Sequence, residues 1–129
     1  MILLDSSALL ALLYDEAGAD TVQATLDEDE CALSLVNLAE VLERGERSGG
    51  DAAVTLATVE LLVRFEPLTA PDALEAARLW PVTRRPALSL ADRLALATAR
   101  RLGADALTAD QAWSAYAAAA RVRVRLVRQ

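Results

Sequence analysis

Short apolar runs alternate with longer amphipathic stretches along the whole chain. The short runs are typical of buried strands, and the longer stretches repeat apolar residues at helical spacing. The strands that we expect lie at residues 2–4, 31–34, 63–67, 105–108 and 121–127. The expected helices lie at residues 8–14, 19–29, 35–47, 52–62, 72–80 and 110–120, with one more from a Ser89 cap to residue 102. This alternation predicts an α/β fold, with a parallel central sheet of four to five short strands flanked by helices on both faces.

The chain has the size of one domain. Its 129 residues contain no repeat, long linker or low-complexity segment, so we treat residues 1–129 as a single domain. Arginines alternate with apolar residues between 121 and 126, which predicts an edge strand with one solvated face. Cys31 and Trp113 are predicted to be core residues.

The composition excludes several kinds of chemistry. The sequence has no histidine and no lysine, so all 13 basic residues are arginines, and it has one cysteine. Ser-His-Asp and Cys-His catalytic groups, lysine-dependent sites and zinc sites built from cysteine and histidine are therefore excluded. Carboxylates, hydroxyls, arginine and a bound metal are left, and oxygen ligands favour Mg²⁺ or Mn²⁺. The absence of lysine also fits a bias in genomic base composition.

The formal net charge of −6 bears on partners. Proteins that bind nucleic acid through their overall field are usually basic, so a nucleic acid would have to be bound here by local arginines and a metal. No apolar run reaches the ~18 residues of a membrane span. The N-terminus has no basic segment and carries Asp5, which does not fit a signal peptide. We expect a soluble cytoplasmic protein without a membrane partner.

Carboxylates follow the predicted strands. Asp5 comes directly after the first strand and Asp110 just after the strand at 105–108. Asp92 lies in the first turn of the helix capped by Ser89, and Glu40 lies in the helix at 35–47, one turn after Asn37. Ligands of such folds bind beyond the carboxyl ends of the strands. Carboxylates that meet there would repel one another unless a divalent cation neutralised them.

Each acid also has a purely structural explanation. Asp5 and Asp110 are suited to cap helices, and Ser89 with Asp92 fits a capping box. Glu40 belongs to a polar stripe along residues 37–47, a pattern that is typical of a solvated helix face. The spacing alone leaves both explanations open.

Four segments, in order, resemble the motifs of PIN-domain proteins. They are MILLDSSALL at 1–10, SLVNLAEV at 34–41, LSLADRLALA at 88–97 and LTADQAW at 107–113. Their order and spacing are similar to the family's across essentially the whole chain. The likeness is to VapC-type toxins, the ribonuclease half of toxin–antitoxin pairs.

This resemblance implies a PIN-like domain that hydrolyses RNA phosphodiester bonds with Mg²⁺ or Mn²⁺. The catalytic carboxylates carried over are Asp5, Glu40, Asp92 and Asp110. The expected metal ligands among them are Asp5, Asp92 and Asp110. The expected supporting residues are Ser6, Asn37 and Thr108.

Three arginines are candidates for contact with the RNA backbone. Arg84 and Arg85 lie in the loop before Ser89, and Arg93 follows Asp92. Exposure to solvent explains all three equally well.

The resemblance also implies a cognate antitoxin that holds the enzyme inactive, and a second copy of the chain is a further candidate partner. Two rival interpretations remain. One is another phosphoryl-transfer enzyme, although the chain lacks the lysine expected of receiver-like domains and the Asp-x-Asp motif expected of haloacid-type phosphatases. The other is a non-catalytic PIN-like interaction module that binds a basic peptide in its acidic pocket.

Overall fold

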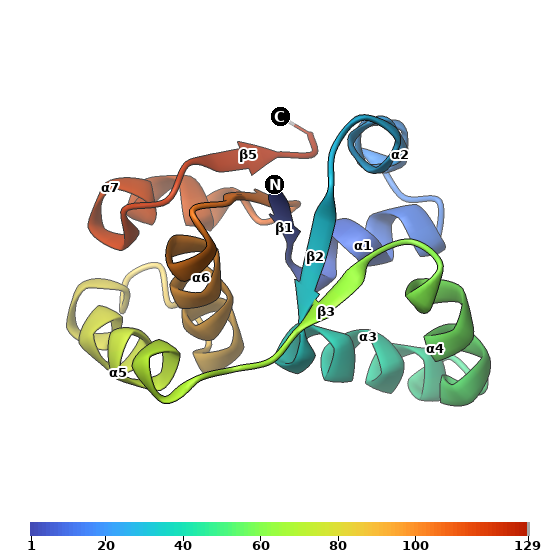
Figure 1. The fold of residues 1–129 in the computed structure, drawn as a ribbon, viewed down its shortest axis with the longest axis horizontal. Helices are drawn as coiled ribbons and strands as arrows, with labels where there is room; N and C mark the ends of the chain where they lie inside the picture. The colour runs from blue at the N-terminus through green and yellow to red at the C-terminus, as the bar shows by residue number, and fades with distance from the viewer. Residues whose placement is uncertain (129) are drawn as a thin grey trace.

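The central feature of the fold is a five-stranded, all-parallel sheet with strand order β3-β2-β1-β4-β5 (Figure 1). The computed structural model describes residues 1–128. The strands are β1 (Ile2–Leu4), β2 (Cys31–Ser34), β3 (Arg64–Glu66), β4 (Asp105–Thr108) and β5 (Val124–Leu126). The predicted fold class is confirmed, and β1 is the central strand.

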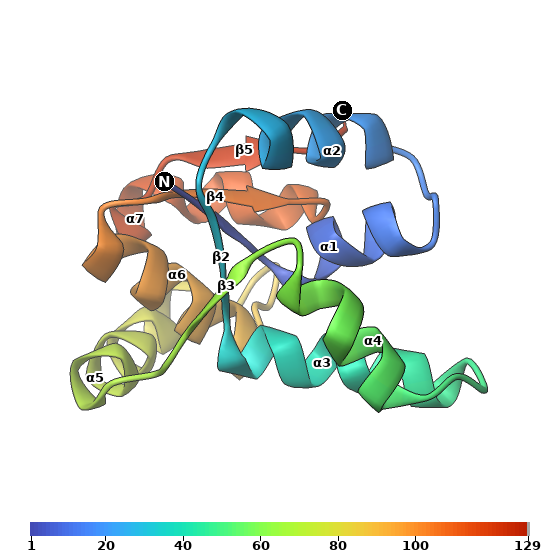
Figure 2. The same cartoon turned by 45° about the vertical axis from the view of Figure 1, so that its right-hand side comes forward.

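Helices cover both faces of the sheet (Figure 2). They are α1 (Ser6–Leu13), α2 (Ala19–Glu28), α3 (Leu35–Arg47), α4 (Ala52–Glu60), α5 (Ala70–Leu79), α6 (Leu90–Leu102) and α7 (Ala117–Ala120). Two short 3₁₀ helices accompany them, η1 (Trp80–Val82) and η2 (Gln111–Tyr116). No helix within residues 1–128 is both long and apolar enough to cross a membrane.

The pleat of β1 divides the core into two clusters. Ile2 and Leu4 face the cluster built from the first four helices, whereas Leu3 faces the cluster that contains α6 and η2. Trp113, with no exposed surface, fills the second cluster, and Cys31 is buried in the first. Both residues therefore belong to the core, as predicted.

Several element bounds shift by up to three residues from the sequence prediction, and two differences have a clear physical reason. Helix α1 begins at Ser6 instead of residue 8, because Asp5 accepts a hydrogen bond from the Ala8 backbone and caps the helix. The helix expected at 110–120 divides into η2 and α7. A 3₁₀ helix has three residues per turn, so it places Trp113 and Tyr116 on the same side, where both are buried.

The outer strands carry the arginines expected of edge strands. On β5, Arg125 pairs with Asp105 of β4 at 2.6 Å, and Arg123 lies 4.0 Å from the same carboxylate. On β3, Arg64 pairs with Glu30 at 3.3 Å. The interpretation of the last strand as a charged edge strand is confirmed.

Candidate active site

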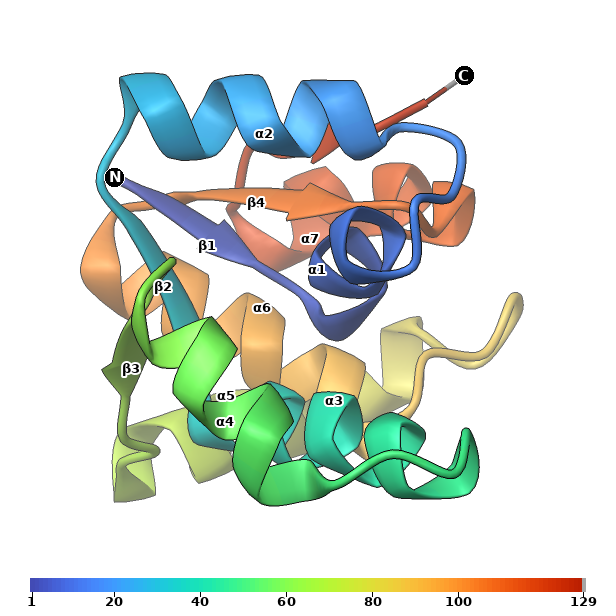
Figure 3. The same ribbon diagram turned by 90° about the vertical axis from the view of Figure 1, so that its right-hand side faces the viewer.

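Asp5 lies where the central strand ends and α1 begins. Strands β1 and β4 run side by side in the same direction, and the Asp5 N–H continues their ladder by donating to the Leu107 carbonyl at 3.0 Å (Figure 3). The Asp5 side chain is only 3% exposed. A carboxylate so far from water needs hydrogen-bond donors around it.

Three donors meet the Asp5 carboxylate. Oδ1 accepts hydrogen bonds from the Ser7 hydroxyl at 2.6 Å and from the Ala8 N–H at 3.0 Å. Oδ2 accepts a hydrogen bond from the Thr108 hydroxyl at 2.7 Å. The expected supporting residue Thr108 thus connects the end of β4 to the acid at the end of β1.

The same two hydroxyls also fix the chain after β4. Ser7 Oγ accepts the Ala109 N–H at 2.9 Å, and Thr108 Oγ1 accepts the Asp110 N–H at 3.0 Å. Ser7 was not among the residues singled out from the sequence. Its position two residues after a capping aspartate is the only local signal for its role, because the partner segment is a hundred residues away.

Glu40 is held by residues from two elements. Its Oε1 accepts hydrogen bonds from Asn37 Nδ2 at 2.8 Å and from the Ser6 hydroxyl at 3.0 Å. Asn37 is fully buried, and Ser34, also buried, donates to its Oδ1 and accepts its N–H. The polar stripe on α3 is therefore not a solvated face at this end, and both expected supporting residues, Ser6 and Asn37, contact Glu40.

Asp92 and Asp110 both cap helices. Asp92 Oδ2 accepts the Ser89 N–H at 3.0 Å while Ser89 Oγ accepts the Asp92 N–H at 3.1 Å, which is a capping box. Asp110 Oδ1 accepts the Ala112 N–H at 2.9 Å, and its side chain is exposed. The structural explanation for these two acids is confirmed.

The acids also lie within one another's electrostatic field. Burial raises the pKa of the Asp5 carboxyl to about 6, against the lowering by its three donors, and the charge of Asp92 adds to the rise. Burial likewise raises the pKa of Asp92, with further contributions from the charges of Asp110 and Glu40. A capping role and a shared acidic site are thus compatible, since the same carboxylates do both.

No cation among residues 1–128 compensates this charge. None of the four carboxylates forms an ion pair within that part of the chain. Within the same residues, no three acidic or cysteine side chains are arranged to hold a metal ion by themselves. The four acidic side chains offer only oxygen atoms as metal ligands. This suits a cation that keeps part of its own water shell, as Mg²⁺ does.

The arginines expected to contact RNA are placed differently from one another. Arg93 points away from the acids toward α5, where its Nη1 donates to the Ala76 carbonyl at 2.8 Å and supports the end of that helix. Arg84 and Arg85 lie in the exposed loop between η1 and α6.

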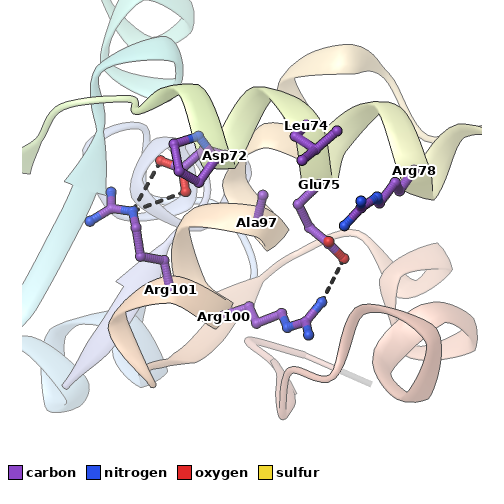
Figure 4. A pocket seen from close by; sticks show the side chains of 8 residues that line it. Asp72, Leu74, Glu75, Arg78, Ala97, Arg100 and Arg101 are labelled. Atoms are coloured by element: carbon purple, nitrogen blue, oxygen red, sulfur yellow. Dashed lines mark hydrogen bonds and ion pairs between the residues drawn. The ribbon is translucent and has the colours of Figure 1, made fainter.

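A cleft between α5 and α6 contains none of the predicted site residues. It has a volume of about 300 Å³, and ion pairs cross it: Asp72 with Arg101 at 2.9 Å, and Glu75 with Arg100 at 2.8 Å (Figure 4). Burial favours a higher pKa for Asp72, but hydrogen bonds from Arg101 and Thr69 outweigh it and lower the pKa. Because these charges are already paired, we interpret them as ion pairs that hold α5 and α6 together.

Comparison with known proteins identifies the family. A family model described as "PIN domain" matches residues 2–119. The chain belongs to the PIN-domain family. The predicted family is confirmed, and the matched range contains Asp5, Glu40, Asp92 and Asp110. No curated protein matches the chain.

Several solved structures share the fold. The crystal structure of VapC20 from Mycobacterium tuberculosis, a sarcin–ricin-loop-cleaving toxin, is 26% identical with a TM-score of 0.75, covering 89% of this chain and 94% of that one. FitAcB from Neisseria gonorrhoeae is 25% identical with a TM-score of 0.67, covering 96% of each chain. VapBC2 from Rickettsia felis, bound to a promoter DNA fragment, is 13% identical with a TM-score of 0.77, covering 98% of each.

The raised pKa of Asp5 predicts a pH-dependent cost in the metal-free protein. Between the ordinary pKa of 3.8 and about 6, the native state binds a proton that the unfolded state has released, so stability falls as pH rises through this range. The difference corresponds to about 3 kcal/mol. Urea unfolding in EDTA should show the wild type losing most of this, about 2 kcal/mol, relative to Asp5→Asn between pH 4 and pH 7.

Asp51 supplies the control. It also caps a helix, accepting the Ala53 N–H at 2.8 Å, but it is exposed. Relative to Asp51→Asn, the wild type should show no such loss over the same pH range. The difference in unfolding free energy between the wild type and Asp5→Asn could instead stay constant with pH or change in the opposite direction. Either result would contradict a buried Asp5 carboxyl with a raised pKa.

Proposed function

We propose that this PIN domain is a Mg²⁺- or Mn²⁺-dependent endoribonuclease toxin that acts in the cytoplasm and is held inactive by a cognate antitoxin. The observation that carries the proposal is the uncompensated group of Asp5, Glu40, Asp92 and Asp110 at the carboxyl edge of the sheet. Electrostatically coupled carboxylates without a cation are costly unless they have a ligand to bind.

The group suits a hard divalent cation. Asp5, Asp92 and Asp110 would hold it, in part through water molecules, because Mg²⁺ usually binds proteins through one or two carboxylates and keeps several waters. When bound, the metal lowers the pKa of a water and neutralises the charge on a phosphodiester. This chemistry needs neither histidine nor lysine, which the chain lacks.

The protein's own side chains orient the site. Ser7, Thr108 and the Ala8 N–H fix both oxygens of Asp5, so this carboxylate cannot rotate freely. Asn37 and Ser6 fix Glu40 through Oε1 alone. The other oxygen, Oε2, accepts no hydrogen bond within residues 1–128 and would be available to accept a proton from the water that attacks the phosphorus.

The relatives support a toxin acting on RNA. VapC20 is described as cleaving the sarcin–ricin loop, and it is more than a quarter identical to this chain over most of its length. A Klebsiella pneumoniae toxin–antitoxin complex shares the fold at 21% identity, with a TM-score of 0.68, covering 85% of this chain and 87% of that one.

An antitoxin can satisfy the same acids. An arginine guanidinium carries the positive charge that the four carboxylates lack and can bind two of their oxygens in parallel. We therefore expect the antitoxin to insert a basic side chain where the metal would bind, which inhibits the enzyme and stabilises the site together.

Metal-dependent cleavage tests the activity. Purified protein should cleave single-stranded RNA with Mg²⁺ or Mn²⁺ and not with EDTA. Asp110→Asn should lower the cleavage rate by about 100-fold or more, because a site carboxylate is lost while the helix cap is retained. The rates are compared at equal protein concentration by resolving the RNA fragments.

Asp51→Asn is the matched control for this assay. Both aspartates are exposed and cap a helix through a backbone N–H two residues on. Asp51→Asn should cleave like the wild type. Cleavage that persists in Asp110→Asn would point to a contaminating nuclease, and binding of a basic peptide without any cleavage would favour the non-catalytic interaction module.

Competition tests the mode of inhibition. If an antitoxin side chain occupies the acidic site, saturating antitoxin should raise the apparent Kd of Mg²⁺ at least tenfold in a calorimetric titration, since the same oxygens cannot serve both ligands. An unchanged Mg²⁺ affinity in the complex would mean that the antitoxin binds elsewhere on the domain.

A further inference from the structure

The loop between α5 and α6 carries an exposed aromatic side chain and two arginines that are not part of the four-acid site. Trp80 is 52% exposed, and the guanidinium carbon of Arg84 lies 4.7 Å from the centre of its indole ring. Within residues 1–128, neither Arg84 nor Arg85 forms an ion pair. By contrast, Arg100 and Arg101 on the neighbouring helix are both paired with acids.

The backbone of this loop is held in place. Thr83 is 2% exposed, and its hydroxyl donates to the Leu79 carbonyl at 2.8 Å. The Leu88 N–H donates to the Thr83 carbonyl at 2.9 Å, and the Tyr116 hydroxyl donates to the Pro86 carbonyl at 2.5 Å. The exposed side chains therefore project from an ordered base, which lowers the entropy cost of binding a ligand.

The same contacts connect the loop to the acidic site. The loop leads directly into the Ser89–Asp92 capping box, and Tyr116 ends the 3₁₀ helix that Asp110 caps. Figure 3 shows the loop between α5 and α6 reaching outward from the body of the molecule. An open hollow of about 440 Å³ lies on it, lined by Pro81, Val82, Arg84 and Arg85.

We propose that the loop at residues 80–86 binds single-stranded RNA beside the acidic site, with Trp80 and Arg84 stacking on a base and Arg84 and Arg85 contacting phosphates. The proposal rests on the function proposed above and assigns it a substrate-binding surface. Indole and guanidinium planes stack on any unpaired base, and arginine binds phosphate oxygens in parallel pairs.

The charge distribution fits RNA as the occupant. The chain carries a net charge of −6, so its overall field repels a polyanion. An RNA strand that reaches the acidic site therefore needs a local positive surface nearby, and the two arginines of the loop supply one that no acid within residues 1–128 neutralises. An unpaired strand is required because a base within a duplex cannot stack on Trp80.

Binding of RNA without metal tests the arginines separately from catalysis. Fluorescence anisotropy with a labelled single-stranded RNA of about 12 nucleotides, in EDTA, gives the affinity. Arg84→Ala combined with Arg85→Ala should weaken binding about tenfold or more. It should also reduce the slope of log K against log salt by about 1.4, as expected for two lost phosphate contacts.

Arg121→Ala is the control for loss of one exposed arginine. Arg121 is exposed and has no ion pair within residues 1–128, but it precedes β5 and so lies at the amino end of the parallel strands, opposite the acids. This variant should retain the affinity and salt slope of the wild type.

Tryptophan fluorescence tests the stacking. The two tryptophans differ in their exposure to solvent: Trp80 is half exposed and Trp113 is fully buried. Acrylamide quenching therefore reports on Trp80. Added RNA should protect Trp80 from acrylamide. Trp80→Phe should keep most of the RNA affinity because the flat ring is preserved, whereas Trp80→Leu should lower it about tenfold.

The outcomes separate the two proposals. Loop variants that bind RNA like the wild type overturn the loop assignment, even if metal-dependent cleavage is observed. Loss of RNA binding in the loop variants, in a protein that never cleaves RNA, supports the loop and overturns the proposed activity. Loop variants that keep RNA binding but lose affinity for the antitoxin overturn the proposal in favour of a protein-docking surface.

Discussion

The carboxylate of Asp5, held out of water at the end of the central strand, is the interaction around which the site is built. Its three donors come from the first turn of α1 and from the end of β4, so a single buried charge joins segments about a hundred residues apart in the sequence. Ser7 and Thr108 in turn hold the backbone of Ala109 and Asp110. Removing this side chain would therefore loosen both the helix cap and the position of a second site acid.

The electrostatic cost of this arrangement is the physical basis for proposing a cationic ligand. Burial and the charge of Asp92 favour the protonated form of Asp5, and no arginine within residues 1–128 pairs with the site carboxylates. The arginines that flank the region are engaged with other groups or stand on the surface: Arg93 supports the end of α5, and Arg84 stacks on Trp80. Under the proposed function, a divalent cation or an inserted guanidinium would relieve this repulsion, and the two would compete for the same oxygens.

Much of the fold could be predicted from the sequence, because the alternation of short apolar runs with amphipathic stretches records which segments are buried on both faces. The position of Asp5 and Asp110 beyond strand ends was predictable for the same reason. The burial of Asn37 was not, since helical periodicity cannot tell a solvated stripe from one covered by α1 and the site. The direction of Arg93 and the role of Ser7 depend on tertiary contacts with distant segments, and the 3₁₀ form of η2 depends on how Trp113 and Tyr116 pack.

The central claim is that Asp92 shares a metal site with the other acids in addition to capping α6. The most direct test is the melting temperature of the wild type, Asp92→Asn and Asp51→Asn, each in EDTA and in Mg²⁺. At about ten times its Kd, Mg²⁺ should stabilise the wild type and Asp51→Asn by about 1.4 kcal/mol. Asp92→Asn should melt above the wild type in EDTA, because one repulsive charge is gone, and should gain less from Mg²⁺. A less stable Asp92→Asn protein with an unchanged response to Mg²⁺ would contradict the claim and leave Asp92 as a helix cap only.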